Sequence, residues 1–189
     1  MKFESQLAGG IALYDARRDM PTHESNRYPR RPIMGIKRVY VHHSGGLGSA
    51  GLRGARSSAW YSVITHGWPG AAYHYWIPAR PVLDDRSNLC VLRMQSDGVR
   101  SWHTGGKANG HGVSVCLQGN TTERPLTASH VECLEALLPW LRERHDLSGE
   151  WLSWHSDSKR FGGSGKSACP GKHAEDWLRQ YRREMETDG

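Results

Sequence analysis

The sequence lacks the features that mark several large classes of protein. Its four cysteines include no C-x-x-C pair, which excludes a zinc ribbon and a dense disulfide framework. It has no apolar run of about 18 residues, so no segment is predicted to span a membrane. Repeats and low-complexity tracts are also missing. With a hydrophobic fraction of 37% and a mean hydropathy of −0.67, the chain is predicted to be a soluble globular protein.

The N-terminal end lacks the apolar stretch of a signal peptide, because residues 1–20 contain both acidic and basic side chains. We therefore expect synthesis in a cytoplasm, with delivery to any cell-wall target by another agent. Residues 1–35 are polar, rich in arginine and interrupted by prolines, which predicts an arm that wraps the domain or is partly disordered. The domain itself is predicted to span residues 36–189.

Basic residues outnumber acidic ones, and the formal net charge is +6 at pH 7. This balance favours an acidic partner: nucleic acid, an anionic membrane or an anionic cell-wall polymer. The basic side chains are scattered apart from short pairs such as Arg30-Arg31, as on a solvated surface, and no nucleic-acid-reading motif is present. Attraction to an anionic wall or outer-membrane surface therefore explains the charge better than nucleic-acid binding.

Five short segments have the composition of β-strands. The segment 38–41 alternates β-branched and aromatic residues, and 113–117 is apolar at most positions, as in a buried central strand. Further strands are predicted at 73–77, 89–92 and 151–154. Strands alternate with helical segments along a chain of one-domain length. The pattern predicts a single α/β or α+β domain with a central sheet flanked by helices.

Helical periodicity occurs in three places. The segment 59–64 has i, i+3, i+4 apolar spacing, and Gly67 would help to end that helix. Thr127 can cap a long helix with an apolar stripe formed by Val131, Leu134, Leu137, Leu138 and Leu141. Pro139 lies inside this stripe and is expected to kink or split the helix. A charged C-terminal helix is predicted around residues 177–181.

Three potential metal ligands follow predicted strands or lie in adjoining loops. His42 follows the strand at 38–41, His155 follows the strand at 151–154, and Cys169 precedes Pro-Gly in a loop of small residues. A catalytic zinc site has three protein ligands, often imidazole or thiolate, and a water. Two histidines and one thiolate would leave a positive centre that lowers the pKa of bound water. The spacing alone does not identify a site, because the three residues form no short motif.

Six short blocks give this chain a resemblance to a known family. They are Val41-His42-His43-Ser44; Gly67-Trp68 with Tyr73-His74-Tyr75; Trp102-His103-Thr104-Gly105-Gly106; Gly112-Val113-Ser114-Val115-Cys116-Leu117-Gln118-Gly119; His155-Ser156-Asp157; and Ala168-Cys169-Pro170-Gly171. Together and in this order they resemble the type 2 N-acetylmuramoyl-L-alanine amidases, which include lysozyme-like amidases of bacteriophages and the peptidoglycan recognition proteins.

The resemblance implies a zinc-dependent hydrolase that cuts the amide bond between N-acetylmuramic acid and L-alanine in peptidoglycan. Its fold would be a central mixed sheet flanked by helices, as in peptidoglycan recognition proteins. His42, His155 and Cys169 would be the Zn²⁺ ligands. The hydroxyl of Tyr73 would bind the attacking water or the substrate carbonyl.

The residue that would stabilise the oxyanion departs from the family pattern. Two positions before the last ligand, members have a lysine or a threonine, whereas this chain has Ser167, with Lys166 one position further away. Lys166 could reach in with its long side chain, or Ser167 could donate as a threonine would. We favour Lys166, because a cation contributes more than a hydroxyl to a developing oxyanion.

Three further residues are candidates for substrate binding. His103 stands where the family lines its substrate groove, although it could instead support a metal ligand. Trp68 and Trp102 adjoin glycine-rich loops and could stack on sugar rings. His43 and His74 are predicted to pack or to hydrogen-bond rather than to bind metal, because each alternates with a proposed site residue.

Other functions share this fold. A non-catalytic peptidoglycan-binding module typically lacks a metal ligand, most often the cysteine, whereas this chain keeps all three. A bacteriophage endolysin that waits in the host cytoplasm and acts on the wall after release fits the missing signal peptide. A cytoplasmic amidase that recycles soluble muropeptides fits the fold equally well. We expect a monomer with muramyl peptides as its partner.

Overall fold

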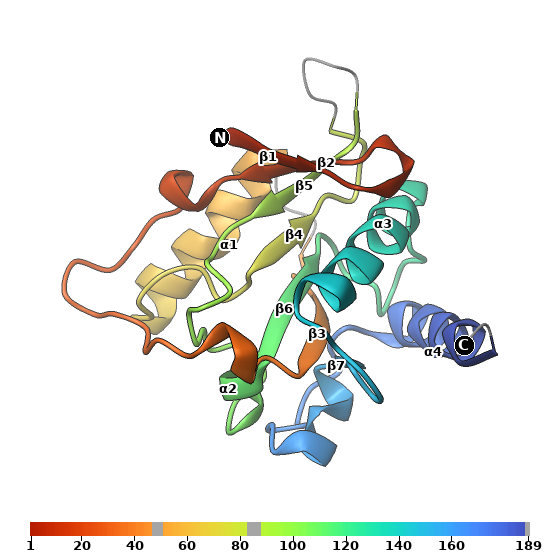
Figure 1. The fold of residues 1–189 in the computed structure, drawn as a ribbon. Helices are drawn as coiled ribbons and strands as arrows, with labels where there is room; N and C mark the ends of the chain where they lie inside the picture. Colours follow the sequence, from red (N-terminus) through yellow and green to blue (C-terminus); the bar gives the residue numbers. More distant parts are fainter. Residues whose placement is uncertain (47–50, 83–87, 188–189) are drawn as a thin grey trace.

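The computed structural model describes residues 1–46, 51–82 and 88–187. Within them, seven strands form one mixed β-sheet in the order β1-β2-β5-β4-β6-β3-β7 (Figure 1). The strands are β1 Lys2–Gln6, β2 Ala12–Asp15, β3 Arg38–His43, β4 Tyr75–Ile77, β5 Cys90–Arg93, β6 Gly112–Leu117 and β7 Leu152–Trp154. The pairs β1–β2 and β4–β5 are antiparallel and the other neighbours are parallel. The predicted fold class and all five predicted strands are confirmed.

Helices cover both faces of the sheet. The helix α1 Gly51–His66 lies on one face, and α3 Ala128–Arg144 and α4 Lys172–Thr187 lie on the other (Figure 1). The short helix α2 Ala108–His111 leads into β6. Short 3₁₀ helices complete the fold at Ala8–Gly10, Arg17–Asp19, Ile33–Gly35 and Ser156–Phe161. Among the described residues, no helix combines the length and the apolar character that crossing a bilayer requires.

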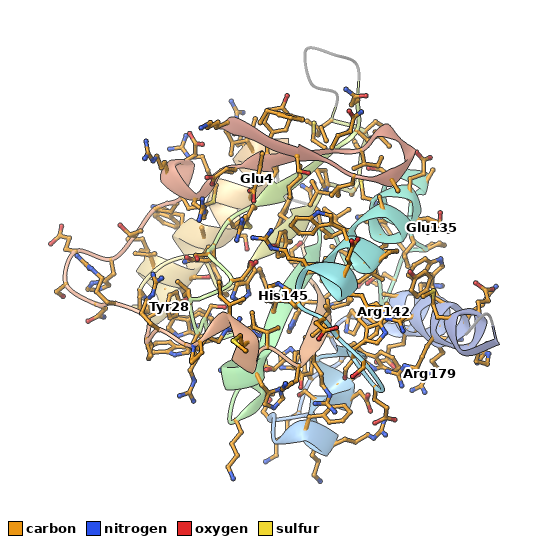
Figure 2. The ribbon with its side chains drawn as sticks, in the orientation of Figure 1. Glu4, Tyr28, Glu135, Arg142, His145 and Arg179 are labelled. Carbon is orange, nitrogen blue, oxygen red and sulfur yellow. The ribbon has the colours of Figure 1, made fainter. Side chains whose placement is uncertain are left out.

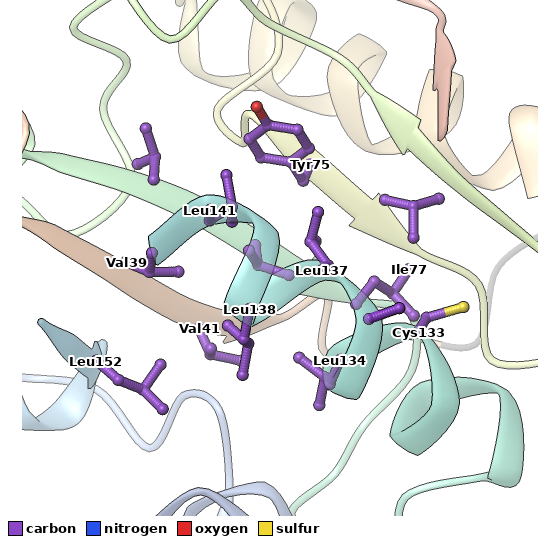
Figure 3. Close-up of a cluster of buried hydrophobic side chains, with 14 of the residues drawn as sticks. Val39, Val41, Tyr75, Ile77, Cys133, Leu134, Leu137, Leu138, Leu141 and Leu152 are labelled. Carbon is purple, nitrogen blue, oxygen red and sulfur yellow. The ribbon is translucent and has the colours of Figure 1, made fainter. Parts of the chain in front are cut away.

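Alternate residues of the central strands point to opposite faces of the sheet. On β3, Val39 and Val41 pack in the larger core beneath α3, whose Leu134, Leu137 and Leu138 lie over them (Figure 3). The residues that alternate with them, Tyr40 and His42, are also buried but point to the face that α1 covers. The smaller core on that face contains Ala55, Ala59, Trp76, Leu92 and Cys116.

The helix α3 begins where its capping residue predicts and continues through its proline. The Thr127 hydroxyl accepts from the His130 N–H, and the His130 ring accepts from the Thr127 N–H. Of the two expectations for Pro139, a kink or a split, the split is wrong, because α3 continues from Ala128 to Arg144. Pro139 is exposed, so water can solvate the carbonyl that its missing N–H leaves free. The buried leucines on the opposite side stabilise the helix against the sheet.

The prediction of an arm over residues 1–35 is corrected for residues 2–15, which form β1 and β2 of the sheet. β2 runs parallel beside β5, with Ala12 opposite Cys90, and Leu13 is fully buried. The pairing partner of β2 lies far along the chain, so no local pattern could reveal the pairing.

A buried arginine anchors the segment that follows. Arg31 is only 9% exposed, and its guanidinium donates to the backbone carbonyls of Asp97, Asn109 and Gly112. Burial lowers its pKa to about 10. The Arg30-Arg31 pair, expected on a solvated surface, therefore contains a structural residue beneath the loop that carries His103.

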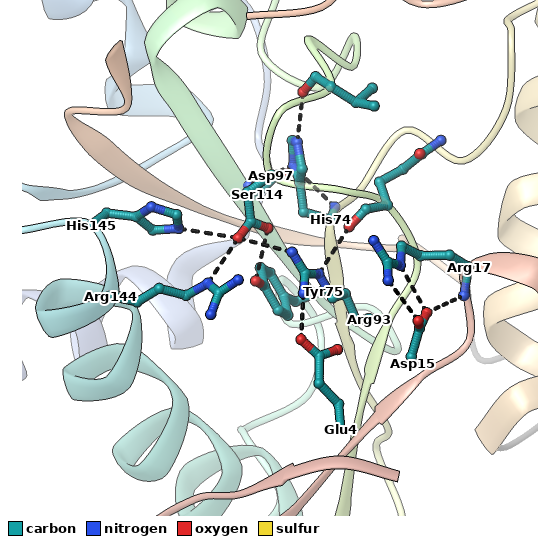
Figure 4. Close-up of polar contacts among 12 residues, drawn as sticks. Glu4, Asp15, Arg17, His74, Tyr75, Arg93, Asp97, Ser114, Arg144 and His145 are labelled. Carbon is teal, nitrogen blue, oxygen red and sulfur yellow. Dashed lines mark hydrogen bonds and ion pairs between the residues drawn. The ribbon is translucent and has the colours of Figure 1, made fainter. Parts of the chain in front are cut away.

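A carboxylate at the centre of the fold joins strands to the end of α3. Asp97 is fully buried, and its Oδ2 lies 3.1 Å from both Arg93 and Arg144 and 3.3 Å from His145 (Figure 4). Burial alone would raise the pKa of Asp97, but these partners outweigh burial and lower it. Arg93 also pairs with Glu4 of β1, and Glu4 and His145 are labelled among the side chains in Figure 2. The network ties the N-terminal strands to the rest of the domain.

Candidate metal centre

Two of the predicted ligands meet because neighbouring parallel strands end at the same edge of the sheet. β3 and β7 are adjacent, and Val41 pairs with Trp154. His42 and His155 are the next residues along, so they stand at the same level. Their ring centroids are 4.9 Å apart. His42 is fully buried and His155 is partly buried.

Cys169 reaches the same point from the loop before α4. The backbone N–H of His43 donates to Cys169 Sγ at 3.2 Å, and the N–H of Ser156 donates to the Cys169 carbonyl at 2.9 Å. Gly171 has a φ of +90°, and a Cβ there would lie 2.4 Å from the backbone nitrogen of Thr122. Only glycine allows the ligand loop to pack this closely.

The three donor atoms lie near the separations that one zinc ion requires. The ligand atoms of His42, His155 and Cys169 are all within 4.8 Å of one another, and Cys169 Sγ is 3.6 Å from His42 Nδ1. Ligand atoms around a tetrahedral zinc ion stand about 3.3–3.8 Å apart. The donor types also suit zinc, so the cluster is consistent with a zinc site.

A chain of hydrogen bonds fixes which nitrogen of His42 is free. His42 Nε2 lies 3.2 Å from His103 Nδ1, and His103 Nε2 lies 3.2 Å from the carbonyl oxygen of Gly112. A carbonyl only accepts, so His103 Nε2 carries its proton and Nδ1 of the neutral ring accepts. The proton between the rings therefore belongs to His42 Nε2. This leaves His42 Nδ1, which faces Cys169, unprotonated and able to bind a metal.

Burial favours the uncharged form of these side chains. It is the main cause that lowers the pKa of His42 and His103 well below the usual value, and it also lowers the pKa of His155. Burial raises the pKa of the Cys169 thiol to about 12. The imidazoles are therefore neutral at pH 7, and a metal ion that binds here must displace the thiol proton.

The predicted catalytic residues differ in their relation to the cluster. The ring of Tyr73 is 5.2 Å from that of His42, and burial raises the pKa of the Tyr73 hydroxyl well above its usual value. Ser167 Oγ accepts from the N–H of Cys169 at 3.1 Å, which holds this hydroxyl in the ligand loop with its own proton free to donate. Lys166 is exposed, and the described residues show no contact between it and the cluster.

The predicted substrate-binding residues divide into two groups. Trp68 and Trp102 contact each other edge to face at 6.0 Å, and Tyr28 contacts Trp102 at 5.2 Å, so the three rings form a row. Trp102 is 37% exposed and could meet a ligand. His103 is 5% exposed and contacts His42, one of the predicted ligands, through its Nδ1, instead of lining an open groove.

A cavity of about 280 Å³ opens at the same edge of the sheet as the cluster. Ser44, which follows β3, lines it together with Trp76 and Gln118, and α1 forms its other wall with Ser57, Ser58 and Tyr61. This space lies within reach of the cluster, since Ser44 is two residues beyond His42.

Sequence reasoning missed the polar side chains that hold these loops. Asn109 Oδ1 accepts from the N–H of His103 at 3.1 Å and from that of Thr104 at 2.8 Å. Ser156, next to a ligand, donates its hydroxyl to Glu175 in the first turn of α4. Asn109 is close to His103 along the chain and could have been suspected as a loop acceptor, but Glu175 has no local signal.

Comparison with known proteins agrees with this geometry. Residues 30–172 match the sequence profile of the family Amidase_2, N-acetylmuramoyl-L-alanine amidase. No curated protein sequence is significantly similar to the chain.

Solved structures share the fold at low sequence identity. Drosophila peptidoglycan recognition protein SD has a TM-score of 0.67 at 16% identity, covering 85% of this chain and 89% of its own. The endolysin amidase LysCS of Clostridium intestinale has a TM-score of 0.61 at 16% identity, with 90% and 95% covered. Human peptidoglycan recognition protein IβC, in complex with glycosamyl muramyl pentapeptide, has a TM-score of 0.65 at 13% identity, with 85% and 90% covered. Because the family profile matches most of its length, the chain belongs to the Amidase_2 family of N-acetylmuramoyl-L-alanine amidases.

Proposed function

We propose that this protein is a zinc-dependent amidase that hydrolyses the bond between N-acetylmuramic acid and L-alanine in peptidoglycan. One observation carries the proposal: in a chain of this family, His42, His155 and Cys169 bring their donor atoms within 4.8 Å of one another. A module that only binds peptidoglycan has no need of two imidazoles and a thiol directed at one point. The fixed tautomer of His42 supports the same conclusion.

Zinc held by these residues would supply a Lewis acid that polarises the scissile carbonyl and lowers the pKa of a water. The remaining tasks fall to the chain itself. Tyr73, whose hydroxyl burial keeps protonated, donates a hydrogen bond that orients the water or the substrate carbonyl. Ser167 donates to the carbonyl oxygen as negative charge develops there. The oxygen of the water bonds to the carbonyl carbon, the C–N bond breaks, and the amine of L-alanine leaves with the proton that the water gives up.

The geometry favours Ser167 over Lys166 for stabilising the oxyanion, the reverse of the order that charge alone suggested. The bond from the Cys169 N–H already holds the Ser167 hydroxyl in place. Lys166 is exposed, so it would have to leave solvent and lose the freedom of a long side chain. A donor held in place before the reaction stabilises a transition state without that reorganisation.

The substrate would lie across the edge of the sheet. We place the stem peptide in the cavity between α1 and Ser44 and the sugar rings near Trp68 and Trp102, whose faces suit stacking. Within the family we further propose the role of a bacteriophage endolysin, released to the wall after synthesis in the host cytoplasm. Two observations support this role. The structural match to the Clostridium endolysin amidase covers 90% of this chain and 95% of that protein. The net charge of +6 favours binding to bacterial walls, which are anionic.

Digestion of purified peptidoglycan with and without a chelator tests the proposal. Mass spectrometry should detect free stem peptides with an L-alanine amino terminus, and these should disappear on chelation and return with zinc. Intact muropeptides under every metal condition would leave a binding module as the function. A comparison of cross-linked sacculi with soluble muropeptides separates the endolysin from a recycling amidase, which would cleave only the soluble substrate efficiently.

A further inference from the structure

The helix α1 buries its small residues and exposes its large ones. Its buried positions are Gly51, Gly54, Ala55, Ala59, Ser62 and Val63. In contrast, Trp60 is 56% exposed and Ile64 is 61% exposed. A helix that only covers a sheet turns its large apolar side chains inward. The folding of this domain therefore does not explain the residues on the outer side of α1.

The same outer side carries two arginines. Arg53, Arg56, Trp60 and Ile64 follow one another at spacings of three and four residues, which places them in one line along the helix. The sequence of α1 contains no acidic residue. Within the part of the chain that the structure describes, neither guanidinium has an ion-pair partner. We call these four residues the α1 outer strip.

A cavity of about 580 Å³ adjoins the strip, between α1 and the N-terminal segment. Arg53, Arg56 and Trp60 line one side of it, and Met20 and Pro21 line the other. Asp19 also lines the cavity, and its carboxylate is paired with the amino group of Met1 at 3.0 Å. The cavity thus combines two guanidinium groups, an acidic group that already has a cationic partner, and apolar side chains. This combination fits a phosphate attached to a hydrocarbon chain.

We propose that the α1 outer strip docks on an anionic lipid surface. Guanidinium groups bind phosphate, tryptophan prefers the boundary between headgroups and acyl chains, and an aliphatic side chain such as Ile64 gains from entering the acyl region. A glycan would explain the tryptophan but not Ile64. The cavity beside the metal centre is lined by other α1 residues, Ser58 and Tyr61, so docking leaves that cavity open. The proposal does not depend on the amidase activity.

Sedimentation of the full chain with vesicles tests the docking. Vesicles of phosphatidylcholine alone are compared with vesicles that contain about one third phosphatidylglycerol, at low and at high salt. We expect binding to the anionic vesicles only, weakened by salt. R53Q/R56Q should weaken it about 25-fold, since each arginine near an anionic surface contributes about fivefold. W60S/I64S should weaken it about tenfold or more.

Two matched variants control for total charge and for exposed apolar surface. R124Q/R183Q removes two exposed arginines elsewhere, and M34S removes a methionine that is 90% exposed. Both should bind as the unchanged protein does. All variants should keep their melting temperature and their activity on soluble muropeptides, since the altered side chains lie on the surface away from the cluster. Equal binding to both kinds of vesicle, no binding to either, or an equal loss in strip and control variants would overturn the proposal.

Discussion

The two faces of the central sheet carry different kinds of side chain. Beneath α3 lies the larger hydrophobic core, to which β3 contributes Val39 and Val41. On the other face the same strand presents Tyr40 and His42, beside polar residues of the neighbouring strands such as Ser114. Because side chains alternate along a strand, one strand can contribute to stability and to chemistry at once. Substitutions on the two faces should therefore have separable effects.

Loss of a metal ligand should have the largest effect. C169S and H155A should each lower amidase activity by at least about a thousandfold, because the site would no longer hold its metal in a catalytic geometry. Rates on purified peptidoglycan and metal content after dialysis measure this. H23A, which alters a partly exposed histidine outside the cluster, should retain full activity. Normal turnover by both ligand variants would refute the site.

A cavity on the α3 face should reduce stability and leave the chemistry intact. Leu137 is fully buried against the sheet, so L137A should lower the free energy of unfolding by about 2–5 kcal/mol. Denaturant unfolding measures this, and activity per folded molecule should not change. E135A, on the exposed side of the same helix, should change stability by about 0.5 kcal/mol at most. A large fall in the activity of folded L137A would show that the faces are coupled.

Substitutions of the neighbouring residues Lys166 and Ser167 identify which of them stabilises the oxyanion. S167A should lower kcat by about 10²–10³-fold with little change in KM, because it removes a donor used in the transition state. K166A should change kcat by less than about threefold. The opposite ranking would assign the role to Lys166, as the charge argument predicted.

Loss of the hydrogen bond between His42 and His103 should weaken metal binding without removing a predicted ligand. H103F leaves His42 Nε2 without its acceptor, so zinc affinity should fall by about 10–100-fold, measured by competition with a chelator. Y40F is the control, because the Tyr40 ring packs 5.8 Å from that of His103 but takes no part in the chain of bonds. Equal affinity in H103F and the unchanged protein would mean that the bond does not orient the ligand.

Acid should destabilise the fold through its buried histidines. Burial lowers the pKa of His74 to about 3 and that of His130 to about 4, from 6.5. The unfolded chain binds protons below pH 6.5 that the folded chain does not, so stability is full above this pH and falls as the pH drops towards these lower values. Each histidine contributes up to about 1.4 kcal/mol per pH unit.

The variant H130Q isolates one of these contributions. Glutamine preserves the capping-box acceptor of α3 but does not titrate. Its free energy of unfolding should therefore fall less steeply between pH 6 and pH 4, within the window set by the ordinary and the lowered pKa of His130. An unchanged slope would show that His130 is not neutral in the folded protein.

The parts of the fold that depend on residues close together in the chain could be predicted from the sequence. The strand that leads to His42 and the cap at Thr127 follow from neighbouring residues, and the family blocks indicated all three predicted ligands. The pairing of β2 with β5 could not be predicted, because the two segments lie far apart in the chain. The burial of Arg31 was missed for a similar reason, since its carbonyl acceptors come from distant parts of the chain.

The residues that hold or adjoin the predicted metal ligands could be predicted only in part. His103 belongs to a family block, but its position behind His42 depends on how the loop folds over β3 and β6. The preference for Lys166 rested on charge, whereas the structure adds a bond that only Ser167 makes. Residue types therefore indicate which chemistry is available, and the contacts that each side chain makes in the folded chain indicate which residue is held in place.

Cobalt substitution tests the central claim most directly. The metal-free protein would be titrated with Co²⁺, and its absorption spectrum would be compared with that of C169S. We predict one cobalt ion per chain, intense visible bands of a tetrahedral site and a near-ultraviolet thiolate-to-cobalt band that C169S lacks. A spectrum without thiolate ligation, or one identical in C169S, would contradict the assignment of His42, His155 and Cys169 as the metal centre.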